Sequence, residues 1–308
     1  MLLTAIASDR FLTPVNVENL VRRTALFGII SVGAAFVIVT GGIDLSIGSV
    51  ICLVGCLLPW LLEVHGWPVG VALPFVLALA AAIGLAHGLL VTRLRLQPFV
   101  VTLCGLLLYR GVARGITGDQ TVGFGIGHGT LRELGAGRVE LAGGVGIPAP
   151  VFVTALVAVL SWVFFARTVY GRWLIALGRN EEATRFSGVP TQRMTVLAYV
   201  VCAFLAGVGG CLFVLDVNSA QPSDFGNFYE LYAIAGAVLG GCALRGGEVS
   251  IVGVLIGTAV MQVLRNSIRL VEWIPQQIEF AVIGAVILGG VVVDELVKRV
   301  AARRAREG

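Results

Sequence analysis

Residues 24–64 read TALFGIISVGAAFVIVTGGIDLSIGSVICLVGCLLPWLLEV, two apolar runs separated by a break that holds paired glycines and one aspartate. An α-helix needs about 20 apolar residues to cross a lipid bilayer, and each run is close to that length. In lipid, a helix also satisfies its own backbone N–H and C=O groups. The stretch therefore predicts two membrane-spanning helices, at 20–41 and 44–64.

The composition extends this pattern to the whole chain. Of its 308 residues, 57% are apolar and 13% are charged, and the mean hydropathy is +0.94. Soluble proteins carry roughly 25% charged residues. We therefore predict an all-α, polytopic membrane helical bundle of about nine transmembrane helices. The predicted helices are 20–41, 44–64, 68–92, 97–116, 150–167, 192–215, 229–244, 249–269 and 276–297.

Of the 41 glycines, 22 lie inside these predicted helices. Small residues spaced four apart allow helix backbones to approach closely in lipid. Such spacings are typical of helix–helix contacts and occur at Ala80, Gly84 and Gly88; Gly111 and Gly115; Gly236 and Gly240; and Gly253 and Gly257.

The distribution of arginine predicts the orientation. The loops at 93–95 and 167–193 and the tail at 298–308 are rich in arginine, whereas 216–230 holds three acidic residues and no basic one. The positive-inside rule places the first three in the cytoplasm, including the C-terminus, and 216–230 outside. Nine crossings that end inside would begin outside, against the rule for Arg10, Arg22 and Arg23. We therefore expect a tenth helix in front of residue 1.

The chain is expected to form one transmembrane domain. Its parts are a first helix group at 20–116, an outer loop at 117–149, a second helix group at 150–297 and the basic tail. The glycine-rich outer loop is too long for a tight turn, and loops of this length are usually functional.

Motifs for catalysis are absent from the sequence. Its single lysine, Lys298, lies outside any phosphate-binding loop, and its three histidines lack the spacing of a metal site. Cys52 and Cys56 share a helix face, and we interpret them as small packing residues rather than a metal pair. We expect no catalytic residue, metal, cofactor or nucleic-acid partner, so any ATP hydrolysis belongs to another subunit.

The break at 41–48 has two interpretations. Asp44 and Ser46 can cap the following helix, which would satisfy N–H groups that lipid leaves unpaired. Alternatively, an intramembrane carboxylate is retained for a transport path or gate. The candidate residues here are Gly41, Gly42, Asp44 and Ser46.

Two further stretches carry similar alternatives. In GRWLIALGRNEEATRFSGV at 171–189, Asn180 can cap a short amphipathic helix that either docks a cytoplasmic partner or lies on the lipid surface. In YELYAIAGAVLGGCALRGGE at 229–248, a short glycine-interrupted helix either lines a cavity or packs tightly at an inner loop. Its candidate path residues are Gly240 and Gly241.

In these three stretches the chain resembles the permease subunits of bacterial ABC importers for ribose, xylose, galactose and related monosaccharides. GGIDLSIG at 41–48 is similar to the family's first-half motif, 171–189 to its cytoplasmic loop, and 229–253 to its late glycine-rich motif. In the loop, Glu182, Ala183, Thr184 and Gly188 occupy the family's Glu, Ala, Ala and Gly places. The likeness covers nearly the whole chain in order and spacing.

The sequence departs from this family at four positions. Thr184 stands in place of the second alanine, Tyr232 in place of an aspartate, and Cys242-Ala243 in place of a Thr-Ser pair. These departures leave the class intact and bear on the substrate and the activity. The family normally has ten spans, in agreement with the expected helix in front of residue 1.

The resemblance implies a division of labour. Two permease chains, identical or related, would form the path through the bacterial inner membrane, cytoplasmic ABC ATPase subunits would drive it, and a soluble sugar-binding protein would deliver the sugar outside. The resemblance places ATPase coupling on Gly178, Asn180, Glu181, Glu182, Ala183 and Gly188.

Other classes remain as alternatives. A permease for branched-chain amino acids or another small nutrient shares the general fold. An ion-coupled secondary transporter would need mid-membrane titratable groups, for which Asp44 and His87 are the candidates.

Overall fold

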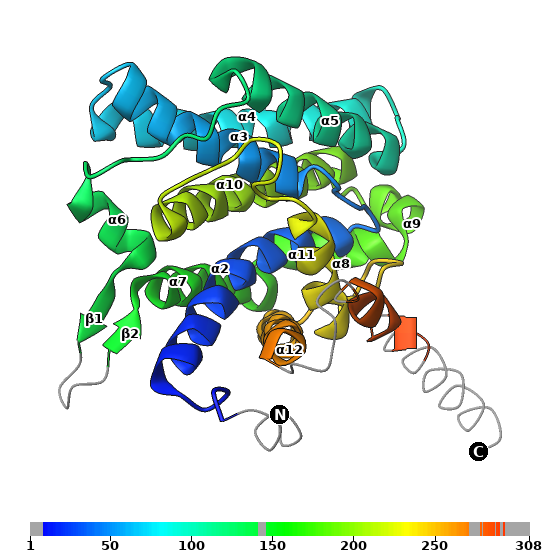
Figure 1. Ribbon diagram of the computed structural model, residues 1–308. Helices are drawn as coiled ribbons and strands as arrows, with labels where there is room; N and C mark the ends of the chain where they lie inside the picture. Colours follow the sequence, from blue (N-terminus) through cyan, green and yellow to red (C-terminus); the bar gives the residue numbers. More distant parts are fainter. Residues whose placement is uncertain are drawn as a thin grey trace.

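The structure is a computed structural model that describes residues 9–140, 146–270, 278, 280–286, 288–289 and 292. Within this part the fold is helical, apart from one antiparallel hairpin of two short strands and a single isolated bridge (Figure 1). The elements in chain order are α2 (Pro14–Ile38), α3 (Ile47–Pro59), the π-helix η1 (Trp60–Val64), α4 (Val69–Arg93), α5 (Pro98–Thr117), α6 (Gly129–Ala136), β1 (Arg138–Glu140), β2 (Gly146–Pro148), α7 (Ala149–Arg167), α8 (Val169–Arg179), α9 (Glu181–Phe186), α10 (Thr191–Val217), α11 (Tyr229–Leu239) and α12 (Ile251–Leu270).

Three helices form the centre of the bundle. α2, α3 and α10 are mostly buried, and α10 packs against both α2 and α3. α4 and α5 pack on the α3 side, while α7, α11 and α12 pack around α2. The peripheral helices α4, α5, α7 and α12 are apolar, yet less than half of each is buried. Exposed apolar surface of this extent suits contact with lipid rather than water.

Seven helices in the described part are long and apolar enough to cross a membrane. They correspond to seven of the predicted ranges. The short helix predicted at 229–244 is present but ends earlier, because α11 stops at Leu239 and has only 11 residues, too few to span a bilayer. The predicted helix at 276–297 lies partly outside the described residues, and the basic tail at 298–308 lies wholly outside them.

Small residues produce the closest helix contacts. A methyl group built on Gly84 would lie 2.7 Å from the Cα of Val200, and one on Gly88 would lie 2.7 Å from the Cα of Val196, so α4 touches the backbone of α10. Gly236 lies in α11 and Gly240 directly follows that helix. Both pack in the same way against α12, at Gly253 and Gly257. The prediction for Gly111 and Gly115 is wrong for the described residues, because nothing there lies within 4 Å of their added methyl groups.

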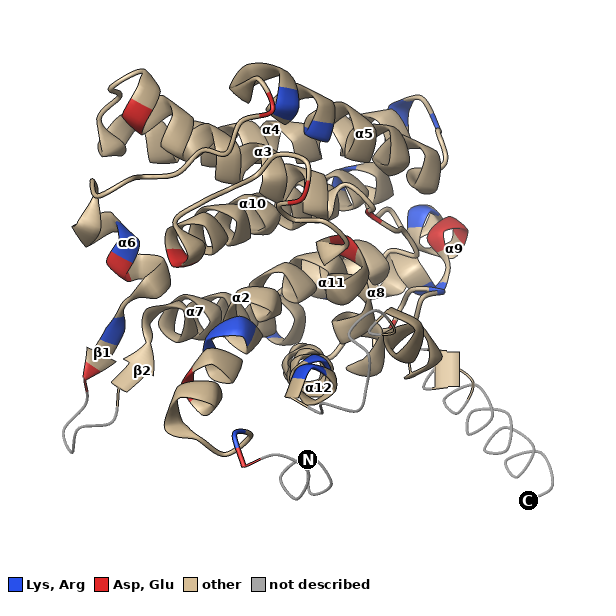
Figure 2. Ribbon diagram, viewed as in Figure 1, with Lys and Arg blue, Asp and Glu red and all other residues tan. Residues whose placement is uncertain are grey.

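The two ends of the bundle differ. α9 and the α4–α5 loop lie at one end, on the right of Figure 1, and α6 and the hairpin lie at the other. Figure 2 shows most of the ribbon uncharged, with arginines and acidic residues around α9 and arginines on the α4–α5 loop. We refer to these as the α9 end and the α6 end. The predicted outer loop at 117–149 lies at the α6 end and contains α6 and the hairpin.

Candidate functional site

The break at 41–48 turns the chain between α2 and α3. α2 ends at Ile38, and Gly41 has φ +80, a left-handed conformation that glycine adopts without steric cost. Asp44 is only 2% exposed, and its Oδ1 accepts hydrogen bonds from the Ser46 backbone N–H (2.8 Å) and hydroxyl (2.6 Å). The predicted cap is therefore right for Asp44 and wrong for the Ser46 side chain. The Ser46 hydroxyl donates to the nearby carboxylate, a stronger acceptor, and makes no cap of its own.

A buried polar cluster surrounds this break. His87 and Tyr199 are 2% and 0% exposed, and the hydroxyl of Tyr109 lies 2.8 Å from the His87 Nε2. Three atoms of the cluster make no hydrogen bond to the described residues: Asp44 Oδ2, His87 Nδ1 and the Tyr199 hydroxyl. Buried polar atoms normally have a partner. A carboxylate at the centre of a bilayer also costs about 2.5–3.5 kcal/mol on insertion scales. Packing alone would be served better by apolar side chains, so this polar cluster is a candidate functional site.

The stretch at 171–189 forms two short helices at the α9 end. α8 ends at Arg179, and the Asn180 Oδ1 accepts the Ala183 N–H at 2.9 Å, so the predicted cap is confirmed. Glu181 and Glu182 occupy the first turn of α9 and are exposed, as is Ala183. Gly188, at φ +82, turns the chain towards α10. Phe186 is 78% exposed, which leaves an apolar side chain in the open on a charged helix.

The three stretches meet at a glycine junction, made of Gly41, Gly178, Gly246 and Gly247. The Gly247 N–H donates to the Val39 carbonyl at 2.9 Å, and Gly178 of α8 packs directly on both of these groups. A methyl group on Gly246 would lie 2.8 Å from the Gly41 nitrogen. The end of α2, the end of α8 and the loop after α11 are therefore in backbone contact.

A cavity of about 650 Å³ lies beside the junction. Gly41 and Gly42 line one part of it, and Glu181 and Glu182 of α9 line another. Tyr199 from the buried cluster also contributes to its wall. The structure thus brings together two groups of residues that lie some 140 positions apart in the sequence.

The structure separates other predicted residues from this cavity. Gly240 packs on Gly253 of α12, and Gly241, at φ +91, has open space around it in the described part. Sequence reasoning missed Gly246 and Gly247 as contact residues, although the paired glycines were a usable signal. It also missed Tyr199, because one tyrosine in a long apolar helix carries no such signal.

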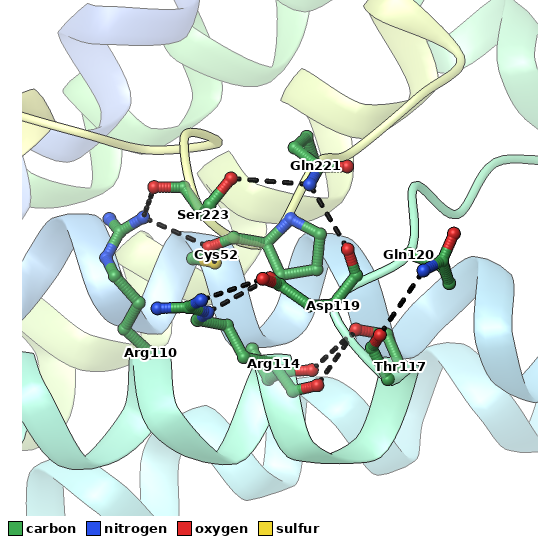
Figure 3. A network of polar contacts seen from close by, with 11 residues as sticks. Cys52, Arg110, Arg114, Thr117, Asp119, Gln120, Gln221 and Ser223 are labelled. Carbon is green, nitrogen blue, oxygen red and sulfur yellow. Dashed lines mark hydrogen bonds and ion pairs between the residues drawn. The ribbon is translucent and has the colours of Figure 1, made fainter.

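A polar network beside the C-terminal half of α5 fixes the coil at 218–228 (Figure 3). The Arg110 Nη1 of α5 donates to the backbone carbonyls of Pro222, Ser223 and Phe225 at 3.2–3.3 Å. Nearby, the Arg114 guanidinium makes two hydrogen bonds to Asp119, at 3.0 and 2.7 Å, and holds the pKa of that carboxyl below its usual value. The arginines at the end of α5 thus bind loop groups, Arg110 the coil backbone and the exposed Arg114 the Asp119 carboxylate.

α11 begins with a buried carboxylate. Glu230 is 6% exposed and packs on Gly48 at the start of α3. Tyr232, which replaces the aspartate expected from the family, is 4% exposed, and the Arg265 guanidinium lies 4.0 Å from the centre of its ring. A cation over an aromatic face is attracted to it. The departure at 232 therefore has a specific contact in this fold.

Comparison with known proteins identifies the family of this chain. The profile of the family described as "Branched-chain amino acid transport system / permease component" matches residues 16–291. The chain belongs to this family. Its fold class, an all-α polytopic permease, and the predicted resemblance to monosaccharide importer permeases are both confirmed.

Several curated relatives of this permease align over most of their length. It is 38% identical to the ribose import permease of Escherichia coli (strain K12), over 93% of this chain and 88% of the relative. It is 35% identical to the ribose import permease of Bacillus subtilis (strain 168), over 96% and 89%. It is 30% identical to the xylose transport system permease of Escherichia coli (strain K12), over 94% and 87%. No solved structure matched the chain.

Family membership makes the chain a multi-pass protein of the inner membrane that serves transport. It is a permease component rather than a catalytic subunit. The glycine junction and the cavity are therefore parts of a transport protein.

Proposed function

We propose that this chain is the membrane-spanning subunit of an ATP-binding-cassette importer that carries a monosaccharide of the ribose or xylose type. The relatives named for these sugars support the substrate class. The observation that carries the mechanism is the glycine junction, where the three motif stretches of the sequence are in backbone contact beside one cavity.

The α9 end is the cytoplasmic end in this proposal. The arginines of the α4–α5 loop and of 167–193 support this orientation, and the C-terminus is then also cytoplasmic. ATPase subunits dock on α9 and its flanks, using Gly178, Asn180, Glu181, Glu182, Ala183 and Gly188. A sugar-binding protein delivers the sugar at the α6 end, and a second permease copy completes the channel.

Coupling needs no catalytic residue in this chain. The ATPase subunits hydrolyse ATP, and their movement reaches α8 through α9. Gly178 passes that movement to the end of α2 and to the loop after α11, because all three are in contact at the junction. Gly41, Gly42, Asp44 and Ser46 then form the gate, while Gly240 and Gly241, which lie apart from the cavity, are not part of it. If the helices can pack in two arrangements, one with the gate open and one with it closed, the movement of the ATPase subunits needs only to favour one arrangement over the other.

Two other functions have an observation in their favour. The family description names branched-chain amino acids, which keeps an amino-acid permease as the second candidate. The burial of Asp44 and His87 is the feature that an ion-coupled carrier would share. Uptake that stops when ATP is depleted, but survives collapse of the proton gradient, separates an ATP-driven importer from the ion-coupled carrier.

The docking proposal has a direct test. Glu182→Ala and Gly188→Ala together should reduce sugar uptake and co-purification of the ATPase, while membrane insertion stays normal. Glu182 is exposed, so its substitution leaves the fold intact. Gly188 has φ +82, where an alanine costs about 1–2 kcal/mol of backbone strain. Glu140→Ala on the exposed strand β1 serves as the control. Unchanged ATPase co-purification in the double variant removes the docking claim.

A further inference from the structure

The chain between α10 and α12 crosses the bundle without a full-length helix. α10 ends at Val217 beside the α6 end, where Ala220 pairs with Val122. Gly246 and Gly247 already lie at the α9 end, in contact with Gly178. α11 has 11 residues and so covers only about 16 Å of this distance. The coil at 218–228 covers the rest.

The coil reaches the middle of the bundle. Gly226 packs against Gly48 at the start of α3, and the neighbouring Ser49 hydroxyl lies 3.4 Å from the Gly105 carbonyl of α5. Gly105 is the eighth of the 20 residues of α5, so it lies about 12 Å from one end of a helix about 30 Å long. Figure 1 shows the coil, in yellow, running from α10 to α11 across this region.

One side of the coil is attached to the protein. Its carbonyls at Pro222, Ser223 and Phe225 accept from Arg110, and the Cys52 thiol lies 3.3 Å from the Pro222 carbonyl (Figure 3). The Phe225 ring fills the space left by Gly55 on α3. These contacts hold the backbone of the coil in place.

The other side of the coil is exposed and mostly polar, apart from Phe228, which is 40% exposed and whose ring packs against Phe280. Ser223, Asp224 and Asn227 are all exposed. At comparable depth on the lipid-facing helices the exposed residues are apolar, such as Leu107 on α5 and Leu160 on α7. Irregular backbone at membrane depth is tolerated only inside protein or beside water, and a carboxylate is strongly disfavoured in lipid. The exposed side of the coil therefore faces water or another protein surface rather than lipid.

We propose that Ser223, Asp224 and Asn227 line the water-filled path through the membrane and bind the hydroxyl groups of the sugar in transit. This inference rests on the proposed function for the identity of the ligand. A sugar is a neutral polyol, and its hydroxyls both donate and accept hydrogen bonds. The Asp224 carboxylate accepts, while the Ser223 hydroxyl and the Asn227 amide both donate and accept. Arg110 positions these side chains through the coil backbone.

The test uses cysteine labelling in the reconstituted transporter complex. Ser223→Cys and Asn227→Cys are made in a Cys104→Ser background, because Cys104 is exposed and the other five cysteines are buried. Each variant is first shown to insert in the membrane and to assemble with the ATPase subunits, and is then treated with a membrane-impermeant methanethiosulfonate. Gln120→Cys, at an exposed position outside the helices, is the water-facing control, and Leu160→Cys on α7 is the lipid-facing control.

The expected result is labelling of both coil cysteines within about 10-fold of the rate at Gln120→Cys, and about 100-fold faster than at Leu160→Cys, since only a hydrated thiolate reacts. Ribose, added with the binding protein and ATP, should slow the labelling, and Asp224→Asn should reduce uptake about 10-fold through loss of a charge-assisted hydrogen bond.

Labelling as slow as at Leu160→Cys would overturn the water-lined path. Fast labelling that ribose does not slow, together with normal uptake by Asp224→Asn, would overturn the sugar contact. Failure of the proposed function is distinct from both, because the unsubstituted complex would then show no ATP-dependent uptake of ribose or xylose.

Discussion

Gly178→Ala is the most direct perturbation of the glycine junction. The added methyl group would overlap both the Val39 carbonyl oxygen and the Gly247 nitrogen, which are the two atoms of a 2.9 Å hydrogen bond. Since these atoms belong to backbone rather than to flexible side chains, α8 must move away from α2. The substitution tests whether this close approach carries the movement of α9 to the gate.

The magnitude follows from three contributions. Overpacking costs about 1–3 kcal/mol, and loss of the Gly247–Val39 hydrogen bond adds about 0.5–1.5 kcal/mol. The better helix propensity of alanine within α8 offsets about 0.5–1 kcal/mol. The net local cost is about 0.5–4 kcal/mol, and a coupling energy of this size changes a linked equilibrium by about 2- to 900-fold.

The assay is ATP-dependent sugar uptake by the reconstituted complex, together with the thermal midpoint of the permease. Gly178→Ala should reduce uptake at least about 2-fold while the protein still folds. Gly111→Ala is the matched control, because it lies in a helix where nothing in the described part approaches the added methyl group. If Gly178→Ala matches Gly111→Ala in both uptake and thermal midpoint, the junction does not have the close contact on which this reasoning depends.

Further substitutions test three separate contacts. Gly84→Ala places a methyl group 2.7 Å from the Cα of Val200 and should destabilise the α4–α10 pair by about 1–3 kcal/mol, seen as a lower thermal midpoint than that of Gly111→Ala. Asn180→Ala removes the cap of α9 and about 0.5–2 kcal/mol of its stability, so less ATPase should co-purify; unchanged binding would contradict this. Tyr199→Phe should be neutral or stabilising because the hydroxyl has no hydrogen bond to the described residues, and it should relieve Gly42→Ala, whose methyl group would lie 2.9 Å from that hydroxyl. Additive effects on the thermal midpoint in this pair would refute the contact.

The family resemblance was predictable because its motifs are local. GGIDLSIG and the cap at Asn180 depend on residues within a few positions of each other, so their turn and cap could be inferred from the sequence. The outcome at Ser46 shows the limit of such inference. Its hydroxyl had a choice between a helix N–H and the Asp44 carboxylate, and only the folded geometry shows that it donates to the carboxylate.

The crossing between α10 and α12 was harder to predict. The apolar run at 229–244 is as hydrophobic as a span, yet α11 covers only part of the distance and a polar coil covers the rest. Hydropathy reports how apolar a segment is on average, whereas the position of the coil depends on Arg110 and Gly48, which are distant in the sequence.

The sequence by itself determined that this chain is a helical membrane protein, where most of its long helices lie, and which family it resembles. These properties depend on composition, on apolar run length and on short motifs, all of which are local. Only the tertiary structure decided that Gly41, Gly178 and Gly247 meet, that Tyr199 borders the cavity, and that the coil at 218–228 reaches mid-depth. These depend on how helices far apart in the chain pack together, and glycine contacts of this kind leave no distinct pattern in a chain that has 41 glycines.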